Sequence, residues 1–251
     1  MATLHGKVVY ITGASRGIGA VTARSLIEAG ASVVAHLGRS SREDDPLLQA
    51  FGPDRVYTLH GDLAVPGEAA RLFQAAIDWK GRVDVLVNNA GISPSLPLDA
   101  PLDEWSRVWT ETLQVNLMSV AEGCRAALLH YGERGGGTII NIASRSAFRG
   151  DSPDAMHCAA SKAGVVALTK SIARGFAGRG VLTYAVAPGW VQTEMAEAYL
   201  AAHAEELARE LPMGVAAPAE DVANTVVFLA SGAVPHMTGA TLDINGASYV
   251  R

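Results

Sequence analysis

Two hydrophobic periodicities alternate along the chain. Short runs rich in β-branched residues predict strands, and segments with apolar residues at helical spacing separate these runs. The predicted strands are Lys7–Thr12, Ala31–Leu37, Arg55–Leu59, Val83–Asn88, Gly137–Ala143, Val181–Val186 and Thr241–Ile244. The predicted helices are Ile18–Ala29, Gly67–Trp79, Leu102–His130, Asp154–Ala177, Thr193–Glu210 and Pro218–Ser231.

Several of these strands are continuous apolar runs, which is typical of parallel strands covered on both faces. Strands separated by helices require crossover connections, and these build a doubly wound sheet. No linker, repeat or low-complexity tract interrupts the 251 residues. We therefore predict one α/β domain over residues 1–251, a Rossmann fold with a seven-stranded parallel sheet and helices on both faces.

The composition narrows the class of protein. A net charge of −5 disfavours a nucleic-acid-binding protein, which usually carries a basic excess. The two cysteines, Cys124 and Cys158, are too few for a secreted disulfide framework, so we expect reduced thiols in a cytoplasmic protein. We expect no signal peptide and no membrane association, because no basic leader or membrane-length apolar run is present.

A glycine-rich segment, Thr12–Gly19, links the first predicted strand to the first predicted helix. Glycines at 13, 17 and 19 allow a tight turn and a close approach to a pyrophosphate, and the helix start offers unpaired N–H groups to that anion. A plain glycine turn is the alternative. The position after the first strand of an alternating chain favours a dinucleotide site.

The end of the second strand favours NADP over NAD. Enzymes that use NAD often place an acidic residue there to bind the ribose hydroxyls. Here the segment from His36 to Ser40 has no acid, and the first one is Glu43. Arg16 and Arg39 are instead placed to face a 2′-phosphate, although both are also compatible with solvated surface positions.

These motifs resemble the short-chain dehydrogenase/reductase family, classical type, over essentially the whole chain. The similar segments are Thr12–Gly19, Asn88–Gly91, Asp62–Leu63, Pro188–Thr193, Met237–Gly239 and Asn245–Gly246. The nearest resemblance is to NADP-dependent 3-oxoacyl-(acyl-carrier-protein) reductases. It implies hydride transfer between NADPH and a carbonyl or alcohol substrate, and a homo-oligomer, tetramer or dimer, formed through Leu102–His130 and Asp154–Ala177.

The glycine turn and the resemblance together give a set of predicted cofactor-binding residues. Within the family, Asp62 and Leu63 would contact the adenine, and the segment from Pro188 to Thr193 would hold the nicotinamide amide. The full set is Gly13, Ser15, Arg16, Gly17, Ile18, Gly19, Arg39, Ser40, Asp62, Leu63, Asn89, Ala90, Gly91, Lys162, Pro188, Gly189, Val191 and Thr193.

The resemblance also implies the catalytic residues. Asn116 would hold a proton-relay water, Ser144 would bind the substrate oxygen, and Lys162 would bind the nicotinamide ribose and lower the pKa of the acid. The family has a tyrosine four residues before that lysine, and here Cys158 occupies the position. Residues four apart share one helix face, so this count is preferred to one that would select His157.

The cysteine leaves three hypotheses open. A thiol ends closer to the backbone than a phenol, so the acid cannot reach the same point without a bridging water. In the first hypothesis the protein transfers hydride slowly or with water, His157 or the substrate as replacement acid. In the second it is an NADP-binding protein without reductase activity, such as a scaffold. In the third Cys158 is an introduced change in an ordinary reductase.

Several other residues are compatible with structural as well as functional roles. Tyr184 fits a packed strand aromatic better than a substitute acid. Arg145 and Arg149 follow Ser144 and suit either the mouth of a substrate pocket or a solvated loop. The alanine-rich segment Ala196–Ala208 occupies the place of the family's mobile substrate lid and is equally compatible with a fixed surface helix. The spacing of His, Cys and Asp predicts no metal site.

Overall fold

The computed structural model describes residues 3–39, 46–194, 196, 200 and 202–251. Its centre is a seven-stranded sheet in the order β3-β2-β1-β4-β5-β6-β9, with every neighbouring pair parallel. The strands are β1 Val8–Ile11, β2 Ser32–His36, β3 Val56–Leu59, β4 Val85–Asn88, β5 Gly137–Ile142, β6 Val181–Pro188 and β9 Thr241–Ile244. The predicted fold class is confirmed.

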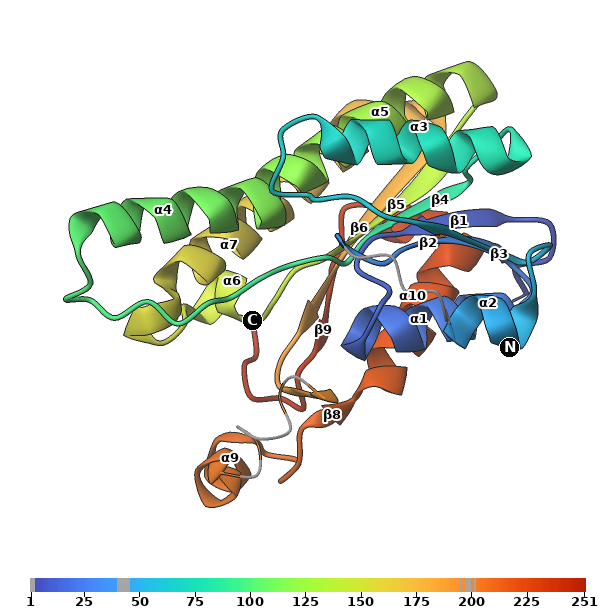
Figure 1. The fold of residues 1–251 in the computed structure, drawn as a ribbon. Helices are drawn as coiled ribbons and strands as arrows, with labels where there is room; N and C mark the ends of the chain where they lie inside the picture. Colours follow the sequence, from blue (N-terminus) through green and yellow to red (C-terminus); the bar gives the residue numbers. More distant parts are fainter. Residues whose placement is uncertain (1–2, 40–45, 195, 197–199, 201) are drawn as a thin grey trace.

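Helices cover both faces of the sheet (Figure 1). One hydrophobic core lies between the sheet and α1, α2 and α10, and a second lies between the sheet and α3, α5 and α7. The helices are α1 Gly17–Glu28, α2 Pro46–Phe51, α3 Glu68–Lys80, α4 Leu102–Leu113, α5 Ser119–Arg134, α6 Ser146–Arg149, α7 Met156–Phe176, α9 Ala204–Glu210 and α10 Ala219–Ser231. Within the described ranges, no helix is both long enough and apolar enough to cross a membrane.

The sheet reverses its winding direction at β1. From β1 the chain builds β2 and β3 on one side and then returns to place β4 on the other, so β1 pairs with both β2 and β4. Ligands of open α/β sheets bind at the carboxyl ends of the strands where the order reverses. The glycine turn after β1 therefore sits at the edge where this fold forms a binding site.

The predicted helix Leu102–His130 is interrupted. A π-helical turn, Gln114–Met118, joins α4 to α5, and the Ser119 N–H donates to the Gln114 carbonyl five residues back. The helical path then continues to Arg134. Hydrophobic spacing does not reveal a single wider turn, yet π-turns are frequent at functional sites. This one contains Asn116.

The predicted helix Thr193–Glu210 is wrong as one continuous element. His203 lies in a turn, and α9 begins after it; residues 195, 197–199 and 201 lie outside the described residues. A small two-stranded sheet, β7 Val191–Gln192 with β8 Ala217–Pro218, brackets this region and was not predicted. Figure 1 shows α9 and β8 set apart from the main sheet. The short helices α2 and α6 were also missed.

Candidate active site

The turn after β1 needs glycine at each predicted position. Gly13 and Gly17 have positive φ angles of 69° and 54°, which side chains of L residues rarely adopt. A Cβ on Gly13 would lie 2.8 Å from Ala90 Cα, and a Cβ on Gly19 would lie 2.0 Å from the Gly13 carbonyl oxygen. The backbone thus packs too closely on itself and on the β4 loop for any larger residue.

Helix α1 begins at this turn with its first amide groups uncapped. Arg16 precedes the helix in an extended conformation, makes no side-chain cap, and no acidic residue occupies the first turn. The first N–H groups of a helix lack intrahelical partners and carry the positive end of the helix dipole. The start of α1 is therefore suited to an anion such as a pyrophosphate.

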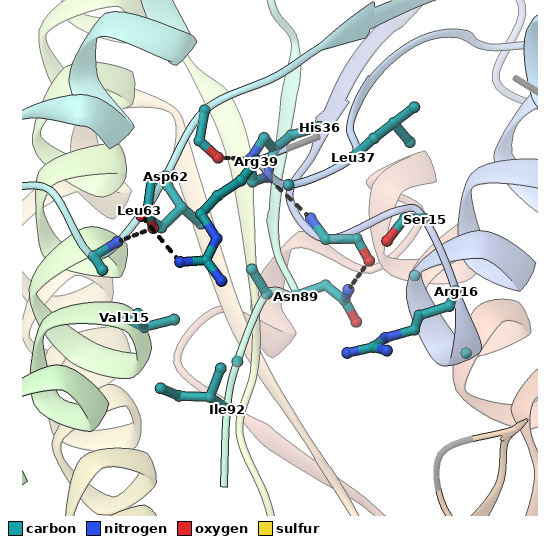
Figure 2. Close-up of a pocket in the computed structure, with 18 of the residues that line it drawn as sticks. Ser15, Arg16, His36, Leu37, Arg39, Asp62, Leu63, Asn89, Ile92 and Val115 are labelled. Atoms are coloured by element: carbon teal, nitrogen blue, oxygen red, sulfur yellow. Dashed lines mark hydrogen bonds and ion pairs between the residues drawn. The ribbon is translucent and has the colours of Figure 1, made fainter. Parts of the chain in front are cut away.

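A cavity of about 600 Å³ opens in front of this helix start (Figure 2). It combines four parts of the sheet edge: the glycine turn after β1, the segment after β2, the loop after β3 and the loop after β4. Thirteen of the predicted cofactor residues line it, namely Gly13, Ser15, Arg16, Gly17, Ile18, Gly19, Arg39, Asp62, Leu63, Asn89, Ala90, Gly91 and Thr193. The volume falls within the range of small-molecule sites.

Four of the remaining predicted cofactor residues, Lys162, Pro188, Gly189 and Val191, do not line this cavity. Pro188 ends β6 and Val191 begins β7, whereas Gly189 packs so closely on Asn245 that an added Cβ would lie 2.8 Å from the Asn245 Cβ. Lys162 lies deeper, and Ser40 and Glu43 lie outside the described residues. Their contacts with a cofactor stay predictions.

His36 belongs to the cavity and was missed as a site residue. The Gly13 N–H donates to its Nδ1 over 3.3 Å, and its Nε2 lies 3.1 Å from the Gly61 carbonyl oxygen. These partners require the neutral tautomer protonated at Nε2. Burial lowers the pKa of His36, although the Gly61 contact opposes that shift. This imidazole therefore ties the glycine turn to the end of β3.

Two arginines flank the cavity from opposite sides, as Figure 2 shows. Arg39 Nη1 lies 3.6 Å from Asp62 Oδ2, and its side chain is 79% exposed, so this ion pair is weak and leaves donors available. Arg16 stands at the start of α1. Glycines, an uncapped helix start and two guanidinium groups form a donor set that fits a phosphorylated dinucleotide.

The lysine and the asparagine of the predicted catalytic set meet at Gly91. A Cβ on Gly91 would lie 3.3 Å from Asn116 Oδ1 and 3.4 Å from Lys162 Nζ, so any larger residue would crowd both groups. Asn116 Oδ1 accepts from the Ile92 N–H, and Asn116 Nδ2 donates to the Ile92 carbonyl, both over 2.8 Å. Asn116 thus clamps the loop after β4, which lines the cavity.

Cys158 and Lys162 lie together on α7. The Lys162 ammonium donates to the Ile142 carbonyl over 2.8 Å. Burial lowers the pKa of Lys162, while the Cys158 thiol beside it raises that pKa. His157, in contrast, is buried against Trp109 of α4, with ring centroids 6.0 Å apart. The helix therefore directs Cys158, and not His157, to the lysine, as the four-residue spacing predicted.

Ser144 follows β5 and has a partner that the sequence analysis missed. Its Oγ lies 2.8 Å from Ser146 Oγ and accepts from the Ser146 N–H over 3.1 Å. Ser146 is buried at the start of α6. If both of these donors point at Ser144 Oγ, the Ser144 hydroxyl keeps its own proton for a ligand oxygen. The two-residue spacing of the serines was the available signal.

Arg145 is not a solvated loop residue. It is only 5% exposed, its Nη1 donates to Ser248 Oγ, and its Nη2 lies 2.7 Å from Glu210 Oε1. Arg149 Nη2 lies 3.2 Å from the same Glu210 oxygen. Tyr184 is buried, and its hydroxyl donates to the Val234 carbonyl, which confirms a packing role. No group of three His, Cys, Asp or Glu suited to a metal occurs among the described residues.

The chain is similar to known reductases over nearly its whole length. The family model described as enoyl-(acyl carrier protein) reductase matches residues 13–247. A 3-oxoacyl-(acyl-carrier-protein) reductase of Vibrio cholerae is 35% identical over 98% of this chain and 99% of its own length.

Solved structures of two kinds of oxidoreductase share the fold. A 3-oxoacyl-(acyl-carrier-protein) reductase from Agrobacterium tumefaciens with NADP bound has a TM-score of 0.87 and 33% identity, covering 97% of this chain and 95% of its own. A gluconate 5-dehydrogenase from Burkholderia cenocepacia in complex with NADP and tartrate has a TM-score of 0.88 and 32% identity, covering 99% and 98%. The glycine turn, the sheet order and these similarities agree that the chain belongs to the short-chain dehydrogenase/reductase family.

Proposed function

We propose that this protein is an NADP-dependent oxidoreductase that interconverts a carbonyl compound and its alcohol. The observation that carries the proposal is the cavity in which the glycine turn, the uncapped start of α1 and two arginines face one space. Relatives of known structure hold NADP and cover nearly the whole chain, which supports the same cofactor here.

The cofactor would supply or accept the hydride, and the residues of this chain would position the substrate and move the proton. Ser144 Oγ would donate to the substrate oxygen. Lys162 Nζ and Cys158 Sγ would lie on the proton path, because both belong to one face of α7. A thiol ends short of the point that a phenol reaches, so a water between Cys158 and the substrate oxygen would complete the path.

The choice of NADP is tested at the two arginines. Arg16 and Arg39 are replaced by alanine together, and calorimetry measures the dissociation constants for NADPH and NADH. We expect NADPH binding to weaken at least tenfold and NADH binding to change little, because only NADPH carries the 2′-phosphate. Equal NADPH binding by the wild type and the double variant would contradict the assignment of these arginines.

The role of Cys158 is tested by Cys158→Tyr. A phenol at this position would reach the substrate oxygen directly, so we expect kcat for ketone reduction to rise by about 10²-fold or more, within the usual contribution of a general acid. NADPH oxidation is followed with a panel of ketones and 3-oxoacyl thioesters. An unchanged or lower kcat, with unchanged NADPH binding, would show that Cys158 does not occupy the acid position.

We further propose a cytoplasmic homo-oligomer built through the helical stretch of α4 and α5 and through α7. Both cysteines are free and buried, which suits a reducing compartment. Leu98, in the turn before α4, and Leu102, the first residue of α4, are 73% and 77% exposed, and such apolar residues favour an interface between copies. Sedimentation of the purified protein tests the assembly, and a monomer at micromolar concentration would contradict it.

A further inference from the structure

A second cavity, of about 780 Å³, adjoins the cofactor cavity, and Thr193 lines both. The rest of its wall comes from the loop after β4, the segment from Arg149 to Ala155, and the residues Trp190, Ala196 and Glu210. The connection between α6 and α7 joins Ser144 to Cys158 along the chain. The two cavities therefore meet at Thr193, and a ligand in the second cavity would lie next to the cofactor cavity.

Many of the residues that line this second cavity have polar side chains. Four of its thirteen residues carry hydroxyl groups, and four more are charged. The hydroxyl residues are Ser93, Ser95, Ser152 and Thr193, and the charged residues are Arg149, Asp151, Asp154 and Glu210. Substrate pockets are usually lined by apolar groups with a few polar ones. An acyl chain would cover these groups without replacing their hydrogen bonds to water, which is unfavourable.

On one side of the cavity, two carboxylates have acceptor capacity to spare. Asp154 Oδ2 accepts from Ser95 Oγ over 2.7 Å, and hydrogen bonds from Ser152 and Ser95 lower the pKa of Asp154. Asp151 Oδ1 accepts from the Ser152 N–H over 2.9 Å. An ionised carboxylate has about four acceptor positions. Both aspartates can therefore accept further bonds from hydroxyl groups of a ligand.

A third carboxylate of the wall, Glu210, is shared by two arginines. Glu210 Oε1 lies 2.7 Å from Arg145 Nη2 and 3.2 Å from Arg149 Nη2. Arg145 is buried, whereas the Arg149 side chain is about one third exposed and lines the cavity. A guanidinium group has five N–H donors, so Arg149 has donors beyond its contact with Glu210 for a ligand in the cavity.

We propose, on the basis of the function proposed above, that this second cavity binds a small polyhydroxylated ketone or the corresponding polyol. Asp151, Asp154 and Ser95 accept its hydroxyl hydrogens, and Arg149 donates to its oxygens. A neutral keto sugar and a keto sugar acid share this chemistry. They differ in the carboxylate, which would lie at Arg149 in the acid.

The test is calorimetry on the protein saturated with NADP⁺. D-sorbitol represents the neutral polyols, D-gluconate the sugar acids, and 3-hydroxybutyryl coenzyme A the acyl thioesters. We expect one of the two polyhydroxylated probes to bind at least tenfold more tightly than the thioester. Binding is measured apart from turnover, so a slow chemical step caused by Cys158 does not affect this result. Arg149→Gln then distinguishes a neutral keto sugar from a keto sugar acid. It weakens D-gluconate binding selectively if the carboxylate of the ligand lies at Arg149.

Asp151→Ala supplies the residue-level test, with Asp54→Ala as the matched control. Asp54 is exposed near the start of β3, away from both cavities. We expect Asp151→Ala to weaken binding of the preferred probe at least tenfold, with NADP⁺ binding and the melting temperature unchanged, and Asp54→Ala to have no effect.

Three results would overturn the inference. Tighter binding of the thioester would assign the cavity to acyl groups and leave the proposed oxidoreductase function intact. If Asp151→Ala binds the preferred probe as tightly as the wild type does, Asp151 does not contact the ligand and the inference is wrong. Failure of the protein to bind NADP⁺ at all would overturn the proposed function itself and the inference with it.

Discussion

Gly19→Ala separates the intrinsic preference of a helix from the packing demands of the cofactor turn. Gly19 is the third residue of α1, where alanine is favoured over glycine by about 1 kcal/mol in an isolated helix. In the folded protein the new Cβ would lie 2.0 Å from the Gly13 carbonyl oxygen and 2.5 Å from Asn89 Nδ2. The first distance is far inside van der Waals contact, and the nearest atom belongs to rigid backbone.

The expected cost follows from what must move. Asn89 Nδ2 donates to the Gly13 carbonyl over 3.0 Å, and the clash displaces this bond together with the turn. Overpacking of this kind costs roughly 1–3 kcal/mol. Each kcal/mol corresponds to about 2–4 °C in melting temperature for a domain of this size, so we expect a decrease of roughly 2–12 °C. The displaced turn should also weaken NADPH binding at least tenfold.

The assay combines thermal unfolding with NADPH calorimetry, and Gly132→Ala is the matched control. Gly132 lies in α5, and an added Cβ there meets nothing within 4 Å. Helix propensity alone should make this variant more stable by about 1 kcal/mol, with NADPH binding unchanged. If Gly19→Ala instead melts at or above the wild-type temperature and binds NADPH as tightly, the proposed role of this close approach is refuted.

Three further changes probe neighbouring groups. Burial lowers the pKa of His36 below its usual 6.5, so the unfolded chain binds this proton first as the pH falls, and the stability of the fold decreases below about pH 6.5. His36→Asn should flatten this decrease in stability when denaturant titrations are repeated across pH. The same dependence of stability on pH in the wild type and the variant would contradict it. Ser146→Ala removes a donor to Ser144 Oγ and should lower kcat about tenfold with NADPH binding unchanged, whereas a change in NADPH affinity alone would count against a positioning role. Thr169→Val leaves the buried Asn141 Nδ2 without its acceptor and should cost about 1–3 kcal/mol in the free energy of unfolding; an unchanged value would mean that the amide finds another partner.

The cofactor side of the site was largely predictable because its signals are local. The glycines of the turn follow a strand directly, and their spacing encodes the turn itself. His36 was missed because its role depends on contacts with Gly13 and Gly61, which come from other elements. A histidine at the end of a buried strand has no sequence signature that distinguishes these contacts from simple burial.

The substrate side was less predictable because loops from distant parts of the chain build it. Arg145 was left undecided between pocket and solvent, and its burial depends on Glu210 and Ser248, 65 and 103 residues away. The break at His203 was hidden by an alanine-rich composition that favours one long helix. The π-turn around Asn116 is a single wider turn, too short to be recognised from hydrophobic spacing.

Calorimetric titration of the wild-type protein with NADPH and with NADH tests the central claim most directly. The cavity in front of α1 predicts one NADPH site per chain, with NADPH bound at least tenfold more tightly than NADH. If neither dinucleotide binds the folded protein at millimolar concentration, the assignment of this cavity to a dinucleotide is wrong.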